Sequence, residues 1–63
     1  MDLDKLKLEL VKSIENIQKK NNEDTSLISE VVNEGIQVSF NLLNKRFFLR
    51  CEIDKRFEKD EIN

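Results

Sequence analysis

The sequence predicts an α+β domain in which an N-terminal helix is followed by a short second helix and a two-stranded antiparallel β-hairpin. Apolar residues recur every three or four positions near the N-terminus and every second position after residue 35, which are the periods of a helix and of a strand. A chain of 63 residues has room for one core. We therefore expect residues 1–63 to form one small domain.

The first element is an amphipathic helix over residues 3–20. Asp2 precedes it and is suited to cap its first turn, and no glycine or proline interrupts it. Asn21 and Asn22 tolerate left-handed backbone geometry, so the helix should end there. The apolar side chains at helical spacing are Leu3, Leu6, Leu10, Ile14 and Ile17.

The second element is predicted as a short helix over residues 25–34. Its apolar residues form adjacent pairs four positions apart, Leu27-Ile28 and Val31-Val32, which share one side of a helical wheel. Gly35 follows where a left-handed residue would end that helix. In the competing interpretation Asn33, Glu34 and Gly35 form a hairpin loop, and the first helix is followed by a three-stranded meander.

The third element is a β-hairpin over residues 36–53, because its apolar residues alternate with polar ones. With Asn44-Lys45 as a two-residue turn, four apolar pairs fall on one face: Leu42 with Phe47, Phe40 with Leu49, Val38 with Cys51, and Ile36 with Ile53. An all-α helical hairpin is the alternative, but it would scatter these residues around a helix. Residues 54–63 are almost wholly charged and are expected to form a frayed helix around Phe57 or a tail.

The residue types that most catalytic sites need are missing from the sequence. It has no histidine, one glycine and one cysteine. It therefore lacks the usual base for a serine or cysteine nucleophile, a glycine-rich phosphate loop and the ligands of a closed zinc site. We expect no enzymatic activity, no metal and no cofactor. Cys51 is expected to be a small buried apolar residue on the inward face of its strand.

Charge and composition restrict the class of protein further. The formal net charge is −2, which does not favour nucleic-acid binding driven by bulk charge. No apolar run approaches the ~20 residues of a membrane span, and the start of the sequence lacks the features of a signal peptide. We expect a cytoplasmic protein. Abundant Asn, Lys, Glu and Ile suggest an AT-rich bacterial or phage genome.

The candidate partner-binding residues are Phe48 and Arg50 on the outward face of the predicted hairpin, with Lys45 and Arg46 at its turn. An exposed aromatic side chain beside arginines on a polar sheet is one way in which proteins stack single-stranded bases. The same Phe can instead be solvated or covered by a second subunit. A partner on this face can therefore be a protein or a nucleic acid.

The expected function is a small regulatory or inhibitory protein-binding module, encoded by a phage or a small bacterial operon, that docks on a larger protein. The alternatives are a small nucleic-acid-binding regulator that uses the basic and aromatic hairpin face, and a structural subunit of an assembly. A homodimer is expected in addition, because a chain this short has a small core and the hairpin has unpaired edges.

Overall fold

The helix predicted for residues 3–20 is present as α1 (Leu3–Lys20) in the computed structural model, which describes residues 2–57. The Asp2 carboxylate accepts a hydrogen bond from the Lys5 backbone N–H at 3.2 Å, so it caps the first turn as expected. The chain leaves the helix at Asn21 and passes through Asn22, whose φ of 55° is left-handed. Both ends of the predicted helix are confirmed.

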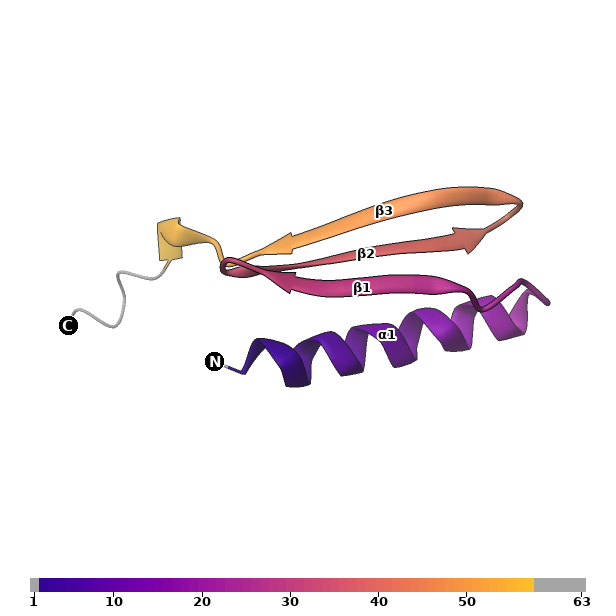
Figure 1. The fold of residues 1–63 in the computed structure, drawn as a ribbon, viewed down its shortest axis with the longest axis horizontal. Coiled ribbons are helices and arrows are strands. Elements are labelled where there is room, and N and C mark those ends of the chain that lie inside the picture. Colours follow the sequence, from indigo (N-terminus) through magenta and orange to yellow (C-terminus); the bar gives the residue numbers. More distant parts are fainter. Residues whose placement is uncertain (1, 58–63) are drawn as a thin grey trace.

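A three-stranded antiparallel sheet follows, with the strands in the order β1-β2-β3 (Figure 1). The strands are β1 (Leu27–Val32), β2 (Gly35–Leu42) and β3 (Lys45–Glu52). The predicted α+β class is confirmed. The two-stranded hairpin is wrong because a third strand joins the sheet, and the alternative of a helix followed by a three-stranded meander describes the fold.

The predicted short helix over residues 25–34 is also wrong, since β1 occupies that segment. The adjacent apolar pairs do not share one face: Leu27 and Val31 pack against the core, whereas Ile28 is 65% exposed on the opposite face. The β-branched residues of this segment favour a strand. Asn33, at a φ of 49°, forms the tight turn that pairs β1 with β2. The tertiary pairing therefore overrides the helical pattern.

The turn between β2 and β3 is formed by Leu43 and Asn44, not by Asn44 and Lys45 as predicted, because Leu42 pairs with Lys45. Both turn residues have positive φ, 56° and 63°, as a type I′ hairpin turn requires. The register therefore moves by two residues, and Phe40 faces Phe47 in place of Leu49. A two-residue shift preserves the faces of a strand, so the predicted apolar face remains intact.

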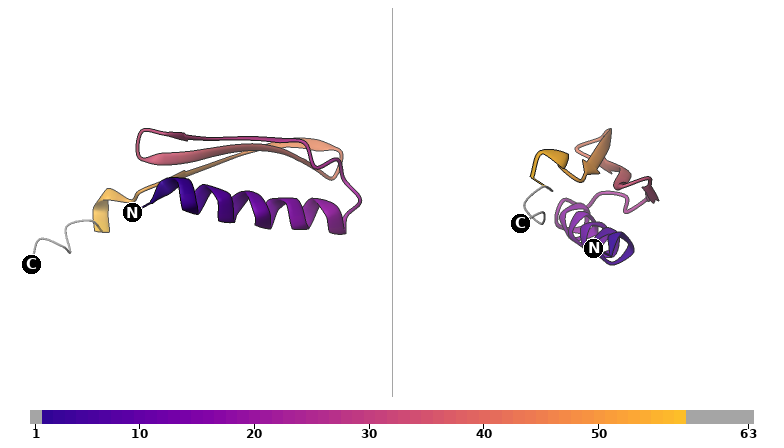
Figure 2. Two further views of the ribbon diagram at one scale, coloured as in Figure 1. Left: turned by 60° about the horizontal axis from the view of Figure 1, so that its bottom comes forward. Right: turned by 90° about the vertical axis from the view of Figure 1, so that its left-hand side faces the viewer.

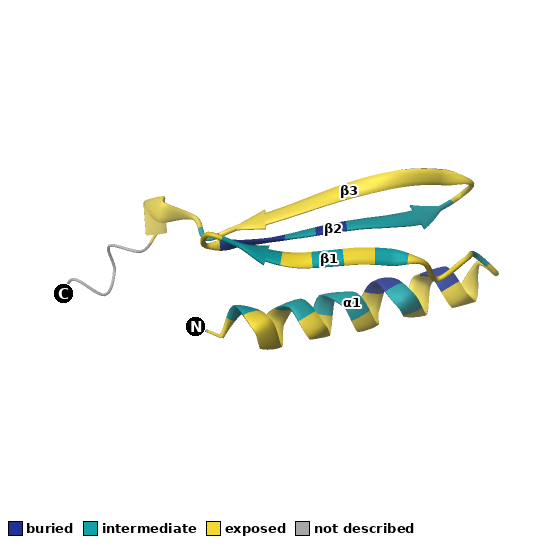
Figure 3. Cartoon of the chain, viewed as in Figure 1, coloured by how far each residue is buried: buried dark blue, intermediate teal, exposed yellow. Residues whose placement is uncertain are grey.

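The hydrophobic core lies between α1 and the first two strands (Figures 2 and 3). Its buried residues are Ile14, Ile36 and Val38. The apolar side chains packed around them are Leu3, Leu10, Leu27, Val31 and Phe40. Strands lie about 4.8 Å apart and a helix is about 10 Å wide, so one helix covers roughly two strands. α1 packs on β1 and β2 and does not reach β3.

Polar contacts hold the C-terminal end of α1 against the β2–β3 turn. The fully buried Gln18 donates from Nε2 to the Asn41 carbonyl oxygen at 2.9 Å. The Glu23 carboxylate accepts from the Leu43 backbone N–H at 2.9 Å. The second bond stabilises the left-handed backbone conformation of Leu43, which is unfavourable for a leucine. The helix and the hairpin turn are therefore fixed to each other at this end of the molecule.

Gly35 has a different role from the predicted helix end. It is the first residue of β2 and has no positive φ. A Cβ atom at this position would lie 2.7 Å from the Cys51 carbonyl oxygen, closer than ordinary contact allows. The glycine therefore permits the close approach of β2 and β3 at the end of the sheet.

The charged C-terminal segment is described only in part. Residues 55–57 form a short 3₁₀ turn directly after the sheet. The rest of the predicted frayed helix or tail, residues 58–63, lies outside the described residues.

Candidate docking surface

α1 packs on β1 and β2 but not on β3, so no described helix covers the helix-side face of β3. Beyond Lys45, at the turn end of the strand, the side chains on this face are apolar, and we name them the β3 apolar strip: Phe47, Leu49 and Cys51. Phe47 and Leu49 are each 40% exposed. The Phe47 ring stacks on Phe40 of β2, with ring centroids 5.8 Å apart, so the strip continues the core outward. It is the part of the core face that the described residues leave exposed.

Cys51 is exposed, so the expectation that it is a small buried residue is wrong. It does point to the helix side of the sheet as predicted, opposite Ile36. Its exposure has the same cause as that of the other strip residues, namely that α1 does not extend over β3. Among the described residues it therefore belongs to a surface rather than to the core.

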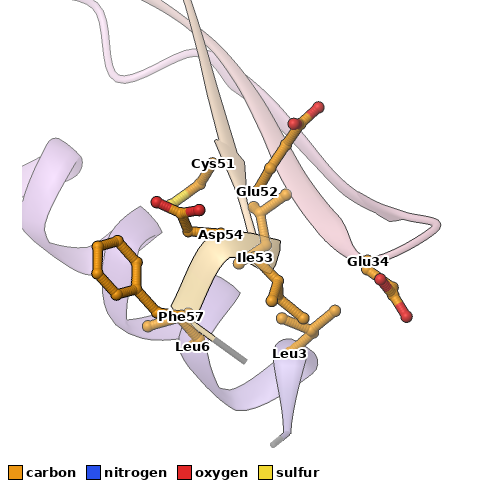
Figure 4. Close-up of a pocket in the computed structure, with 9 residues that line it drawn as sticks. Leu3, Leu6, Glu34, Cys51, Glu52, Ile53, Asp54 and Phe57 are labelled. Atoms are coloured by element: carbon orange, nitrogen blue, oxygen red, sulfur yellow. The ribbon is translucent and has the colours of Figure 1, made fainter. Parts of the chain in front are cut away.

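A pocket of about 380 Å³ lies at the end of the strip, where β3 passes the start of α1 (Figure 4). We name it the terminal pocket. Its apolar lining comes from α1, from β2 and from the segment that starts at the end of β3: Leu3, Leu6, Ile36, Cys51, Ile53 and Phe57. Three acidic residues also line it: Glu34, Glu52 and Asp54. Leu6 is 38% exposed and Phe57 is 64% exposed. Cys51 belongs to the strip and to the pocket, so the two surfaces are continuous.

Ion pairs position Phe57 at the terminal pocket. Lys55 pairs with Glu34 in the β1–β2 turn, and Arg56 pairs with Asp54 at 2.7 Å. The Arg56 guanidinium, which donates hydrogen bonds to the Asp54 carboxylate, lowers the pKa of that carboxyl below its ordinary value. The same guanidinium lies 5.6 Å from the centroid of the Phe57 ring. These contacts join residues 54–57 to one another and to the β1–β2 turn.

Three of the four sequence-predicted partner residues lie together on the other face of the sheet. Arg46, Phe48 and Arg50 alternate along β3 on this outer face, and Phe48 is 64% exposed. Lys45 has the opposite parity, so it lies on the helix side and is not brought to the same face. The prediction places Lys45 and Arg46 at the turn, but the turn lies one residue earlier and both are strand residues.

The charges of the outer face are largely paired within the face. Arg50 pairs with Glu52 at 2.5 Å. The Gln37 amide, with its oxygen directed to Arg50 and its nitrogen to Glu30, bridges these two side chains across β2. Arg46 contacts neutral groups, Ser39 Oγ at 2.9 Å and Asn41 Oδ1 at 3.0 Å. Apart from Arg46, the outer face therefore offers little uncompensated positive charge to a phosphate backbone.

Neither a metal site nor a membrane span is found in the described part of the chain. Within residues 2–57, no group of three or more His, Cys, Asp or Glu side chains is placed to hold a metal ion. No helix of that same part of the chain is long and apolar enough to cross a membrane. No protein-family model matches the sequence, and neither the curated proteins nor the solved structures contain a significant match.

The sequence did not reveal the uncovered strip or the terminal pocket. The apolar alternation of residues 47–51 identified a core-facing strand, but it did not show that nothing covers that strand. The signal that was available is the width of one helix, which spans roughly two strands of a three-stranded sheet. Because residues 25–34 were wrongly assigned to a second helix, two helices were expected to cover the apolar face of the sheet, and no exposed strand was predicted.

Proposed function

We propose that the protein is a small non-enzymatic binding module that regulates or inhibits a larger protein by docking on it with the β3 apolar strip and the terminal pocket. The observation that carries the proposal is the continuous apolar surface formed by Phe47, Leu49 and Cys51 and the pocket beside them. A surface of this kind is typical of protein-interaction sites. The absence of histidine from the sequence further supports a role in binding rather than in catalysis.

The occupant that fits this surface best is the apolar face of an amphipathic helix of the target. Its immediate neighbour would be α1, which already packs on the same side of the sheet. A second helix beside it would cover the uncovered strand and bury the half-exposed Phe47 and Leu49. Burial of apolar area provides about 25 cal/mol per Å².

Binding to the outer face is a less favourable interpretation. Phosphate groups are bound by Lys and Arg side chains that are not already paired with a carboxylate, and Arg50 is already paired with Glu52. A nucleic-acid complex through Arg46, Phe48 and Arg50 would weaken steeply as salt rises, whereas an apolar docking site would not. Salt dependence therefore separates the two functions.

The test is affinity capture of a target from nuclease-treated host lysate, followed by binding measurements with the purified target. We expect Leu6→Ser and Phe57→Ser to weaken binding about tenfold or more, because both remove apolar surface at the terminal pocket. Ile28→Ser is the matched control, because Ile28 is 65% exposed on the outer face of β1, away from the pocket and from β3, and this variant should bind like the wild type. Normal binding by both pocket variants would overturn the proposal.

A further inference from the structure

The outer edge of β3 is an unpaired strand edge whose sequence is complementary to itself. The Ile53 N–H donates to the Glu34 carbonyl oxygen at 3.2 Å, and strand residues bond alternately to the two sides. By that alternation, the residues of β3 that bond to β2 are Lys45, Phe47, Leu49 and Cys51. The residues whose backbone groups point to the free edge are Arg46, Phe48, Arg50 and Glu52. Within residues 2–57, no strand pairs with this edge of β3.

A two-fold dimer formed by antiparallel pairing of β3 with its copy must place one residue opposite itself. Overlap over the full length of β3 (Lys45–Glu52) requires that residue to be Phe48 or Leu49, since these are the central positions. With Phe48 on the axis, Arg46 would face Arg50 of the partner, and like charges directly opposite each other are destabilising. Charge therefore excludes this register.

The register with Leu49 on the axis is complementary over residues 46–52. On the outer face, Arg46 lies opposite the partner's Glu52, and Phe48 lies opposite the partner's Arg50. On the helix side, Leu49 meets its own copy and Phe47 meets the partner's Cys51. Arg46 has no carboxylate partner among the described residues, so the dimer would supply one. The free edge would gain about eight backbone hydrogen bonds, two for each hydrogen-bonded pair.

We propose that two copies of this chain associate through antiparallel β3 strands, with Leu49 on the two-fold axis, into a continuous six-stranded sheet with both α1 helices on one side. The edge of β1 is a weaker candidate, since β1 is shorter and its helix-side face is covered by α1. β3 is the strand that has both an open edge and an uncovered apolar face.

In the dimer, the two β3 apolar strips would form the floor of a groove between the two α1 helices. That a target docks in this groove rests on the proposed function. Each α1 lies over β1 and β2, so the two helix axes would be about four strand spacings, or roughly 19 Å, apart. Packed helices lie about 8–10 Å from each other, so the gap admits one further helix.

Charge reversal tests the register directly. In the Arg46→Glu variant, two glutamates face each other at each end of the interface, and in Glu52→Arg two arginines do. We expect each variant alone to associate at least about tenfold more weakly than the wild type, because facing like charges are unfavourable. An equimolar mixture should form heterodimers, because the glutamate introduced in one variant then faces the arginine introduced in the other. Sedimentation equilibrium measures all three samples.

Cysteine cross-linking provides a second readout that does not depend on charge. In a Cys51→Ser background, Leu49→Cys should form an intermolecular disulfide under mild oxidation, because residues facing each other on the axis have Cα atoms about 4.5–5.5 Å apart. Phe48→Cys and Arg50→Cys are the controls. Each would lie two residues from its own copy along the strand, too far apart to be bridged.

The outcomes separate the dimer from the proposed function. A monomeric wild type whose melting temperature is constant over about a hundredfold dilution would overturn the dimer, because a dimer is stabilised by mass action. Cross-linking through residue 48 or 50 in place of 49 would overturn the register. Leu6 lies on α1, which does not contact β3, so Leu6→Ser should leave self-association unchanged whether or not it weakens target binding.

Discussion

Replacement of Gly35 by alanine tests the closest approach in the sheet. The added Cβ would lie 2.7 Å from the Cys51 carbonyl oxygen, which belongs to the backbone and cannot rotate away. The ends of β2 and β3 must therefore separate, and the nearby hydrogen bond from Ile53 N–H to Glu34 O would lengthen from 3.2 Å. Overpacking costs about 1–3 kcal/mol and a weakened hydrogen bond about 1 kcal/mol.

An opposing term reduces that cost. Gly35 has no positive φ, so alanine can adopt its backbone conformation and lowers the entropy of the unfolded chain, a gain of about 0.4–1 kcal/mol. We expect a net destabilisation of about 1–3.5 kcal/mol, measured by urea unfolding as a shift in midpoint. A domain of this size should then melt roughly 4–28 °C lower, at about 4–8 °C per kcal/mol.

Amide chemical shifts show whether the cost has the stated origin. The changes should be centred on Cys51, Glu52 and Ile53, which lie across the sheet from the substitution. If Gly35 instead ended a helix, alanine would also be unfavourable but would leave these amides unchanged. An alanine variant as stable as the wild type, or shifts confined to residues 31–36, would refute the close-approach argument.

Four further substitutions have expected outcomes. Phe40→Ala should lower the free energy of unfolding by about 2–4 kcal/mol in a thermal or urea melt, because Phe40 packs on the core and stacks on Phe47 of the neighbouring strand. Phe48 is exposed, so Phe48→Ala should change the free energy of unfolding by no more than about 0.5 kcal/mol at concentrations where the chain is monomeric. Leu43→Gly should stabilise the fold by about 0.5–1 kcal/mol, because glycine adopts the φ of 56° without the strain of a leucine; an unchanged melting midpoint would contradict the left-handed turn. Arg56→Gln should raise the pKa of Asp54 toward its ordinary value in an NMR titration, because the lowered pKa comes from the Arg56 hydrogen bond. Since the folded-state pKa is lowered, the contribution of this pair to stability is present above the unfolded pKa and is lost as pH falls through the folded pKa.

The sequence predicted the parts of the fold that local physics determines. The first helix follows from a continuous apolar stripe and from Asp2 at its start, and both of its ends are where they were expected. The apolar face of β2 and β3 follows from strict alternation. The strand faces survive the wrong turn because the register error is two residues, the period of a strand.

The errors come from interactions that are not local. Residues 25–34 carry a pattern compatible with one side of a helix, and only pairing with β2 selects the strand in which Leu27 and Ile28 lie on opposite faces. The turn at Leu43 needs a left-handed leucine, which no propensity favours. It is stabilised by Glu23, twenty positions earlier in the chain. A contact at this sequence distance cannot be seen in a local window.

The candidate site was predicted only for its outer face. Phe48 and Arg50 were expected to share the outward face and do so. Arg46 was expected at the turn but joins them on that face, whereas Lys45 lies on the other side of β3. The apolar strip on the helix side depends on how far α1 reaches, which is a property of packing geometry and not of β3 itself. Alternation along a strand identifies which residues face the core side of a sheet, but it does not indicate whether anything covers them.

Because the apolar face of β3 is exposed, association at this strand should increase the stability of the domain. Of the described residues, the fully or nearly buried apolar ones are Ile14, Ile36 and Val38, a small core for a domain whose ordering entropy is of order 1.5 kcal/mol per residue. Phe47 and Leu49 are the apolar side chains available to enlarge it, and each remains 40% exposed in the single chain. Any occupant of the β3 apolar strip, a second copy or a target helix, extends the core formed by α1, β1 and β2 instead of creating a separate interface. Binding at this surface should therefore raise the free energy of unfolding of the whole domain, and variants that loosen the core, such as Phe40→Ala, should weaken self-association and target binding together.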